Sequence, residues 1–345
     1  HALDKLGVPT TQALAMLSSQ DEVYREKVES AAVVLRVAPS FLRFGNFEYF
    51  AKQKKPAELE KLVRFVCCNY FTEIDLSSNN YVLYFLERVI QLTAEMVAYW
   101  QSIGFVHGVM NTDNMSILGL TLDYGPYAFM DNYNPQQIFN HSDSEGRYTY
   151  VNQPNIAWWN LYRLAEALVV LHPNADELEQ ILAKYAEYYN QKYVQLMGAK
   201  LGLEEFTIDD LPFLDELLQI MQAEKIDWTY FWRKLSYGAS GRSQLSLDYP
   251  SLQLENWFNK LDAFYQCDTV SEQQRQKQML AVNPAITLRS HLVQYAIDRA
   301  EYGNYSEIER LFKALSHPID ELAEFSNYYH IAPDWSEHIV LSCSS

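Results

Sequence analysis

Apolar residues recur at three- and four-residue spacing through most of the chain, with polar residues between them. This spacing is the period of one buried helix face, so it predicts an α-helix wherever it persists. The predicted helices cover residues 57–70, 81–103, 156–171, 176–197, 211–224, 228–235, 252–266, 271–280, 287–302 and 306–315. The chain is therefore expected to be mainly helical.

The N-terminal part has a different pattern. Residues 31–50 mix β-branched and aromatic side chains around Pro39 and Gly45, which predicts two short strands or a strand and a turn. Residues 1–17, HALDKLGVPTTQALAML, are typical of the end of a helix, a stop at Gly7 and a second helix. The chain is therefore expected to start in the middle of a structural element, as a fragment would.

Residues 104–154 interrupt the helical pattern with many Asn, Gly and Pro residues. Short apolar stretches lie between them, for example Met115 to Leu118. A long irregular segment between helices usually carries function, because loops present binding and catalytic side chains on a rigid scaffold. The functional site is therefore expected in this segment.

Composition narrows the class of protein. The 345 residues are 48% hydrophobic and carry 44 acidic against 27 basic side chains, a net charge of -17. The apolar content excludes a disordered chain, and the acidic surface disfavours binding to nucleic acid or to anionic lipid. No apolar run is long enough for a membrane helix. The four cysteines lack the spacing of a zinc site or a disulfide framework, which favours a reducing compartment.

The segment HGVMNTDN, residues 107–114, and the later turn LDYGP contain a candidate metal site. Kinase-like phosphoryl-transfer enzymes place an Asn at the end of a catalytic loop and an Asp at the start of an Asp-X-Gly turn, and both hold Mg²⁺. Asn114 and Asp123 fit these two positions, and Mg²⁺ prefers such oxygen ligands. Residues 115–122 are predicted to form a small hairpin that brings the two side chains together. A purely structural, turn-rich loop is the alternative.

The opening His-Gly is similar to the His-Gly-Asp loop of small-molecule kinases, but Val109 occupies the position of the catalytic Asp. Valine cannot accept a proton, so ordinary kinase chemistry would lack its base. Asp113 is the one carboxylate in the loop that could take this role. His107 is expected to hold the loop through hydrogen bonds rather than to act as a base.

The whole string HGVMNTDNMSILGLTLDYGPYAFMDNYNP resembles the signature of the selenoprotein O family, which are protein adenylyltransferases on a protein-kinase-like fold. The resemblance continues upstream through GVPTTQAL and LRVAPSFLRFGNFEYF. Downstream it continues through NHSDSEGRYTYVNQPNIAWWNLYRLAEAL, NPAITLRSHLVQYAIDRAE and the terminal SCSS. It therefore spans essentially the whole chain.

The resemblance implies an α+β fold that is mainly α. It would be a kinase-like fold that comprises mostly the C-lobe, with part of the N-lobe and extra C-terminal helices. Residues 1–60 would be the remaining part of the N-lobe, and residues 61–270 the helical C-lobe with its catalytic and metal-binding loops at 104–154. Residues 271–345 would form a helical extension and tail.

The resemblance also implies the chemistry. ATP would bind with its α-phosphate toward the acceptor, and AMP would pass to a Ser, Thr or Tyr hydroxyl of a protein while pyrophosphate leaves. Asp113 would be the general base, and Asn114 and Asp123 would hold Mg²⁺, or Mn²⁺ in its place. Arg36 and Arg43 would contact the phosphates. Acceptor proteins would be the partners, without nucleic acid or membrane, in a bacterial cytoplasm or a eukaryotic mitochondrion.

Two departures from the family leave alternatives open. The glycine-rich stretch, the phosphate-contacting lysine and its glutamate partner would all precede His1, so the chain is expected to carry only part of the ATP cleft. In the family's C-terminal redox pair, Cys343 would face Val340 instead of a second thiol. The alternatives are a phosphotransferase of the same fold, a nucleotide-binding fragment without catalysis, and a redox-sensing module that acts through Cys343.

Overall fold

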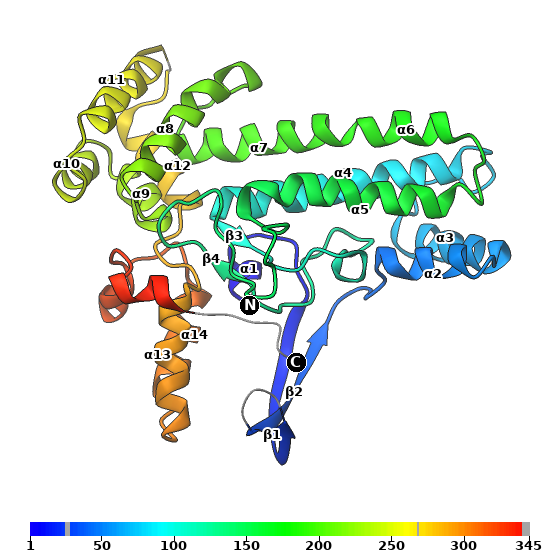
Figure 1. The fold of residues 1–345 in the computed structure, drawn as a ribbon. Helices are drawn as coiled ribbons and strands as arrows, with labels where there is room; N and C mark the ends of the chain where they lie inside the picture. Colours follow the sequence, from blue (N-terminus) through cyan, green and yellow to red (C-terminus); the bar gives the residue numbers. More distant parts are fainter. Residues whose placement is uncertain (25–27, 268, 340–345) are drawn as a thin grey trace.

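The computed structural model describes residues 1–24, 28–267 and 269–339, and it is an α+β protein that is mainly helical. Four helices, α4 to α7, run alongside one another across one side of the molecule, and a two-stranded hairpin and α13 project from the other side (Figure 1). The helices that follow the hairpin are α2 (Phe44–Lys52), α3 (Pro56–Tyr70), α4 (Tyr81–Ile103), α5 (Gln153–Leu168), α6 (Ala175–Ala183), α7 (Tyr185–Leu201), α8 (Leu211–Ala223), α9 (Trp228–Leu235), α10 (Gly238–Asp248), α11 (Leu252–Cys267), α12 (Glu272–Val282), α13 (Ser290–Glu301) and α14 (Ser306–Ser316).

The chain starts with a short helix, α1 (Ala2–Lys5), and Gly7 then adopts a left-handed conformation with φ of 74°. The helix end and the glycine stop are as predicted, but the predicted second helix is wrong. The next element is a strand, β1 (Gln12–Tyr24), which pairs antiparallel with β2 (Val28–Val37). The Ala, Leu and Met residues of β1 favour a helix locally, and pairing with the β-branched partner strand overrides that preference.

The prediction for residues 31–50 is half right. β2 is a strand, but Phe44–Lys52 forms the helix α2 instead of a second strand or a turn. Phe44 and Phe47, three residues apart, are fully buried on one face of this helix. The aromatic residues that suggested a strand are therefore the core-facing side of a short helix.

Helix α4 is the centre of the body and is buried along most of its length. It ends at Gly104, whose φ is 70°, and a Cβ there would lie 2.8 Å from the ring of Trp228. Only glycine combines this left-handed turn with such a close approach. The turn sends the chain into β3 (Phe105–Val106), which pairs with β4 (Ala128–Phe129) and opens the irregular segment.

Most predicted helices are confirmed, with two corrections. The helix predicted over residues 176–197 is two helices, α6 and α7, which meet at Lys184. Helix α10 was missed because its sequence, GASGRSQLSLD, is rich in residues of low helix propensity. Gly241 explains part of that composition, since a Cβ there would lie 1.8 Å from the carbonyl oxygen of Lys234.

The C-terminal helices reach back to the start of the chain. The ring of His1 stacks on Phe312 of α14 with 4.2 Å between ring centroids, and its Nε2 lies 2.9 Å from the hydroxyl of Ser316.

Cys67, Cys68 and Cys267 are free thiols, whereas Cys343 lies outside the described residues. Within the part of the chain that the structure describes, no helix combines the length and the apolar character needed to cross a bilayer.

Lys200, at the end of α7, is a buried cation. Its Nζ donates to Asn283 Oδ1 at 2.8 Å and lies 4.8 Å from the centre of the Trp232 ring. No carboxylate of the described residues forms an ion pair with it. Burial lowers the pKa of Lys200 to about 7.

This burial makes stability depend on pH. Between pH 7 and 9 the unfolded chain, with a lysine pKa of about 10.4, binds more protons at this position than the folded chain, so the free energy of unfolding rises with pH. We expect Lys200→Met to remove this rise, which amounts to about 1 kcal/mol per pH unit. Urea unfolding at several pH values measures it. Lys192→Met removes a half-buried lysine of α7 whose Nζ donates to Gln195, and it should keep the slope; equal slopes in both variants would contradict the prediction.

Candidate active site

A cavity of about 800 Å³ lies between the β1–β2 hairpin, the first residues of the chain and the irregular segment. Its wall includes Arg36 of β2, Arg43 at the start of α2, and Val109, Asn114 and Asp123 from the irregular segment. The volume is within the range of pockets that hold small-molecule ligands and cofactors. Four of the five predicted site residues therefore share one cavity.

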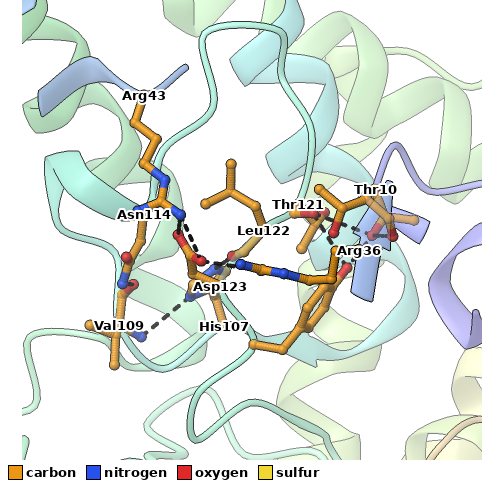
Figure 2. A network of polar contacts seen from close by, with 11 residues as sticks. Thr10, Arg36, Arg43, His107, Val109, Asn114, Thr121, Leu122 and Asp123 are labelled. Carbon is orange, nitrogen blue, oxygen red and sulfur yellow. Dashed lines mark hydrogen bonds and ion pairs between the residues drawn. The ribbon is translucent and has the colours of Figure 1, made fainter. Parts of the chain in front are cut away.

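Asp123 is the centre of a cluster of charges in this cavity (Figure 2). Arg36 Nη1 donates to Asp123 Oδ1 at 3.2 Å, and Arg43 Nη2 donates to the same oxygen at 2.9 Å. The second carboxylate oxygen, Oδ2, lies 2.7 Å from Arg43 Nη2. Two guanidinium groups around one carboxylate leave an excess of positive charge at a point where the rest of the chain is acidic.

The backbone of Asp123 is strained. Its φ is 59°, in the left-handed region that residues with a side chain seldom adopt, and its carbonyl accepts a hydrogen bond from Gly125 N at 2.9 Å. Asp tolerates this conformation better than most residues do. Such strained residues are concentrated at functional sites, where the surrounding structure enforces them.

His107 connects the loop at residues 107–114 with the segment that carries Asp123. Its Nε2 lies 2.8 Å from the carbonyl oxygen of Leu122, next to Asp123, and its backbone N donates to Gln153 Oε1 at 2.9 Å. Burial lowers the pKa of His107, so the ring is held in its neutral form. The ring packs within the protein and does not line the cavity, as expected of a residue that holds the loop.

Buried amides hold the loop at residues 107–114. Asn160 Nδ2 donates to the carbonyl of Met110 at 2.8 Å, and Asn140 Nδ2 donates to the carbonyl of Gly108 at 3.1 Å. Sequence reasoning missed these residues. The signal was present on α5, because Asn160 occupies a position of the apolar period and is fully buried there. A buried amide on an apolar helix face needs hydrogen-bond partners, and Asn160 Nδ2 has one in the loop and a second in the carbonyl of Ile156 of its own helix.

The predicted hairpin at residues 115–122 is wrong, although Asn114 and Asp123 do come together. This stretch contains a turn closed by Gly119 N and the carbonyl of Ser116 at 3.2 Å, but its longer-range backbone hydrogen bonds go to other segments: Ile117 N donates to the carbonyl of Leu42 at 3.0 Å, and Thr121 N donates to that of Pro9 at 2.8 Å. The loop is therefore fixed between α2 and the N-terminal segment. Its backbone groups are satisfied by chain that is distant in sequence, which local patterns cannot reveal.

Asp113 has a different position from the other four. It lies in the short 3₁₀ helix Thr112–Asn114, is exposed, and is not among the residues that line the cavity. Its neighbour Thr112 donates through Oγ1 to Glu48 Oε2 of α2 at 2.7 Å, and Glu48 also accepts from Arg163 Nε at 3.2 Å. Glu48, missed by sequence reasoning, thus ties this turn to α2 and α5.

The donor set of the cavity fits a hard divalent cation. Asn114 Nδ2 donates to the carbonyl of Val109 at 2.9 Å, which leaves the amide oxygen without a hydrogen bond from the described residues. Asp123 Oδ2 is buried and accepts no well-directed hydrogen bond, although it lies against Arg43. No group of three or more His, Cys, Asp or Glu side chains suited to a metal occurs in the described ranges. Mg²⁺ would therefore need phosphate and water oxygens as well, as is usual for Mg²⁺ on a nucleotide.

A model of one protein family matches most of the chain. Residues 1–316 match the model of the family described as "Protein adenylyltransferase SelO". The chain belongs to the SelO family. It is therefore classed with the nucleotidyltransferases, and the loop at residues 107–114 lies inside the matched residues.

Curated relatives cover the whole chain. A protein of Bordetella avium named "Protein nucleotidyltransferase YdiU" is 43% identical over 349 residues, which is 100% of this chain and 71% of that protein. Proteins with the same name from Thioalkalivibrio sulfidiphilus and Pectobacterium atrosepticum are 44% and 42% identical, each over 100% of this chain and 72% of the relative. All three relatives are bacterial.

The buried neutral ring of His107 predicts a loss of stability in acid. Its pKa is lowered in the folded chain, so below pH 6.5 the unfolded chain binds the proton first and the free energy of unfolding falls as the pH falls. We expect His107→Gln, which removes the titration, to lose less stability between pH 7 and 5 than the unmodified chain does. Denaturant unfolding across this range measures it. The exposed His141→Gln is the control, and a steep acid loss in His107→Gln would refute the prediction.

Proposed function

We propose that this chain is a protein adenylyltransferase that transfers AMP from ATP to Ser, Thr or Tyr hydroxyls of acceptor proteins, with Mg²⁺, on a kinase-like fold. The observation that carries the proposal is the convergence of Arg36, Arg43, Asn114 and Asp123 on one cavity. The family assignment gives the reaction class, and the bacterial origin of the relatives suggests a bacterial cytoplasm as the setting.

The two arginines bind the phosphates. In the free chain both guanidinium groups donate to Asp123, and Arg43 Nε is buried without an acceptor among the described residues. Phosphate oxygens offer acceptors of the geometry that guanidinium groups prefer. A Mg²⁺ ion held by Asn114 and Asp123 would offset phosphate charge as the reaction proceeds.

Asp113 takes the proton. The acceptor oxygen attacks the α-phosphorus, the bond from that phosphorus to the oxygen bridging to the β-phosphorus breaks, and pyrophosphate leaves with those electrons. The hydroxyl proton passes to the Asp113 carboxylate. The exposure of Asp113 supports this role, because a residue on a folded acceptor protein can approach it only from the surface. Val109 supports it as well, since the usual base position has no proton acceptor.

Isotope labelling of ATP tests the reaction. With ATP labelled at the α-phosphorus we expect label on protein, and with γ-labelled ATP we expect none. Label from the γ position alone would overturn the proposal in favour of a kinase-type phosphotransferase. Nucleotide binding without label from either position would overturn it in favour of a nucleotide-binding fragment without catalysis.

Replacing Asp113 tests the base. Asp113→Ala should lower kcat by about 10²- to 10⁴-fold, the usual contribution of general base catalysis, while the Kd for ATP stays within twofold. Asp320→Ala, an exposed carboxylate far along the chain, is the matched control and should keep full activity. Full activity in Asp113→Ala would exclude this residue as the base.

The dependence of ATP binding on Mg²⁺ tests Asn114 as a metal ligand. Asn114→Ala should weaken binding of ATP in the presence of Mg²⁺ by about tenfold and leave binding in the presence of a chelator unchanged, because the amide oxygen contacts the ion and not the nucleotide. Calorimetric titration with and without Mg²⁺ gives both constants. An equal loss under the two conditions would mean that Asn114 does not act through the metal.

A further inference from the structure

Gly45 is the second residue of α2, and the helical backbone conformation there does not require glycine. Its φ is not in the left-handed region, and glycine in a helix is less stable than alanine by about 0.5–1 kcal/mol. Glycine is required here because the Asp113 side chain occupies the space that a Cβ would need. A Cβ at this position would lie 2.0 Å from Asp113 Oδ1 and 3.1 Å from its Cγ, so no other residue fits while the carboxylate stays in place.

The chain on both sides of Asp113 is bound to α2, which opposes a movement of its backbone away from such a contact. On one side, Thr112 Oγ1 is bound to Glu48 of α2, and on the other, the carbonyl of Met115 accepts from Phe44 N of α2 at 3.0 Å. The same helix therefore holds the chain on both sides of Asp113. A side chain at position 45 would have to be accommodated by rotating the Asp113 carboxylate.

The first turn of α2 also fixes the phosphate contact. Arg43 is the residue that precedes the helix, and its guanidinium reaches Asp123 in the cavity. The chain from Arg43 to Glu48 thus sets the position of a cavity arginine and, through Gly45, the position of the Asp113 carboxylate. A change at Gly45 should alter the position of the Asp113 carboxylate and leave the position of Arg43 unchanged.

We infer that Gly45 is a positioning residue for Asp113: the lack of a side chain lets the carboxylate lie against the first turn of α2, in the orientation from which it takes the proton of the acceptor hydroxyl. This inference rests on the proposed function, because it assumes that Asp113 is the base. Gly45 itself touches neither nucleotide nor acceptor in this account. Its effect is on the proton transfer and not on nucleotide binding.

The test is Gly45→Ala in the full chain, with α-labelled ATP, Mg²⁺ and label on protein as the readout. We expect kcat to fall at least tenfold while the Kd for ATP stays within twofold. Alanine is the better helix former, so the midpoint of thermal unfolding should show whether α2 has been lost. Gly198→Ala in α7 is the matched control, because its Cβ would lie 2.6 Å from Phe206, far from the site, and it should lower stability but keep kcat.

A double-mutant cycle separates a positioning role from a structural one. If Gly45 acts through Asp113, Gly45→Ala should change the residual activity of Asp113→Ala by less than twofold. An equal loss in both backgrounds, or wild-type kcat in Gly45→Ala, would overturn the inference while leaving Asp113 as the base. Full activity in Asp113→Ala alone would overturn the proposed base and this inference together.

Discussion

The site depends on one carboxylate, Asp123, held in a strained left-handed backbone conformation between two arginines. The three charged groups come from β2, from the residue before α2 and from the irregular segment, so their contacts also fix how these three parts lie on one another. Two cations against one anion leave a positive centre in a chain of net charge -17. A phosphate ligand therefore meets attraction at this place and repulsion over most of the remaining surface.

The rigidity of the site comes from buried polar groups rather than from apolar packing alone. His107, Asn160 and Glu48 each connect the loop at residues 107–114 to a different part of the molecule. Each would be costly to bury without a partner: the loop supplies one for Asn160 and for Glu48, and the carbonyl of Leu122 supplies one for His107. A loop that is irregular in secondary structure can thus be well fixed, because the carbonyl of Met110 and the hydroxyl of Thr112 are bound by side chains of the helices α5 and α2.

The sequence predicts the helical body well and the N-terminal part poorly. Periodicity identified helices such as α4 and α9 because their apolar faces are wide and buried. It failed for β1, whose residues have helical propensity and which is a strand because β2 pairs with it. In the site, motif spacing placed Asn114 and Asp123 in one cavity. It could not show Glu48 or Gly45, because their roles depend on how α2 packs against the loop, a contact between segments distant in sequence.

The arrangement separates the proposed base from the cavity that would hold the phosphates. Asp113 and Asn114 are adjacent in the chain, yet only Asn114 lines the cavity, while Asp113 lies against α2 and faces solvent. Two consecutive residues of a tight 3₁₀ turn cannot point the same way, so the turn directs Asn114 into the cavity and Asp113 toward α2 and the solvent. This geometry suits a reaction with a large second substrate. In the proposed reaction the nucleotide would occupy the cavity, and the acceptor protein would approach from the exposed side of Asp113, so that its hydroxyl could reach both this carboxylate and the α-phosphorus.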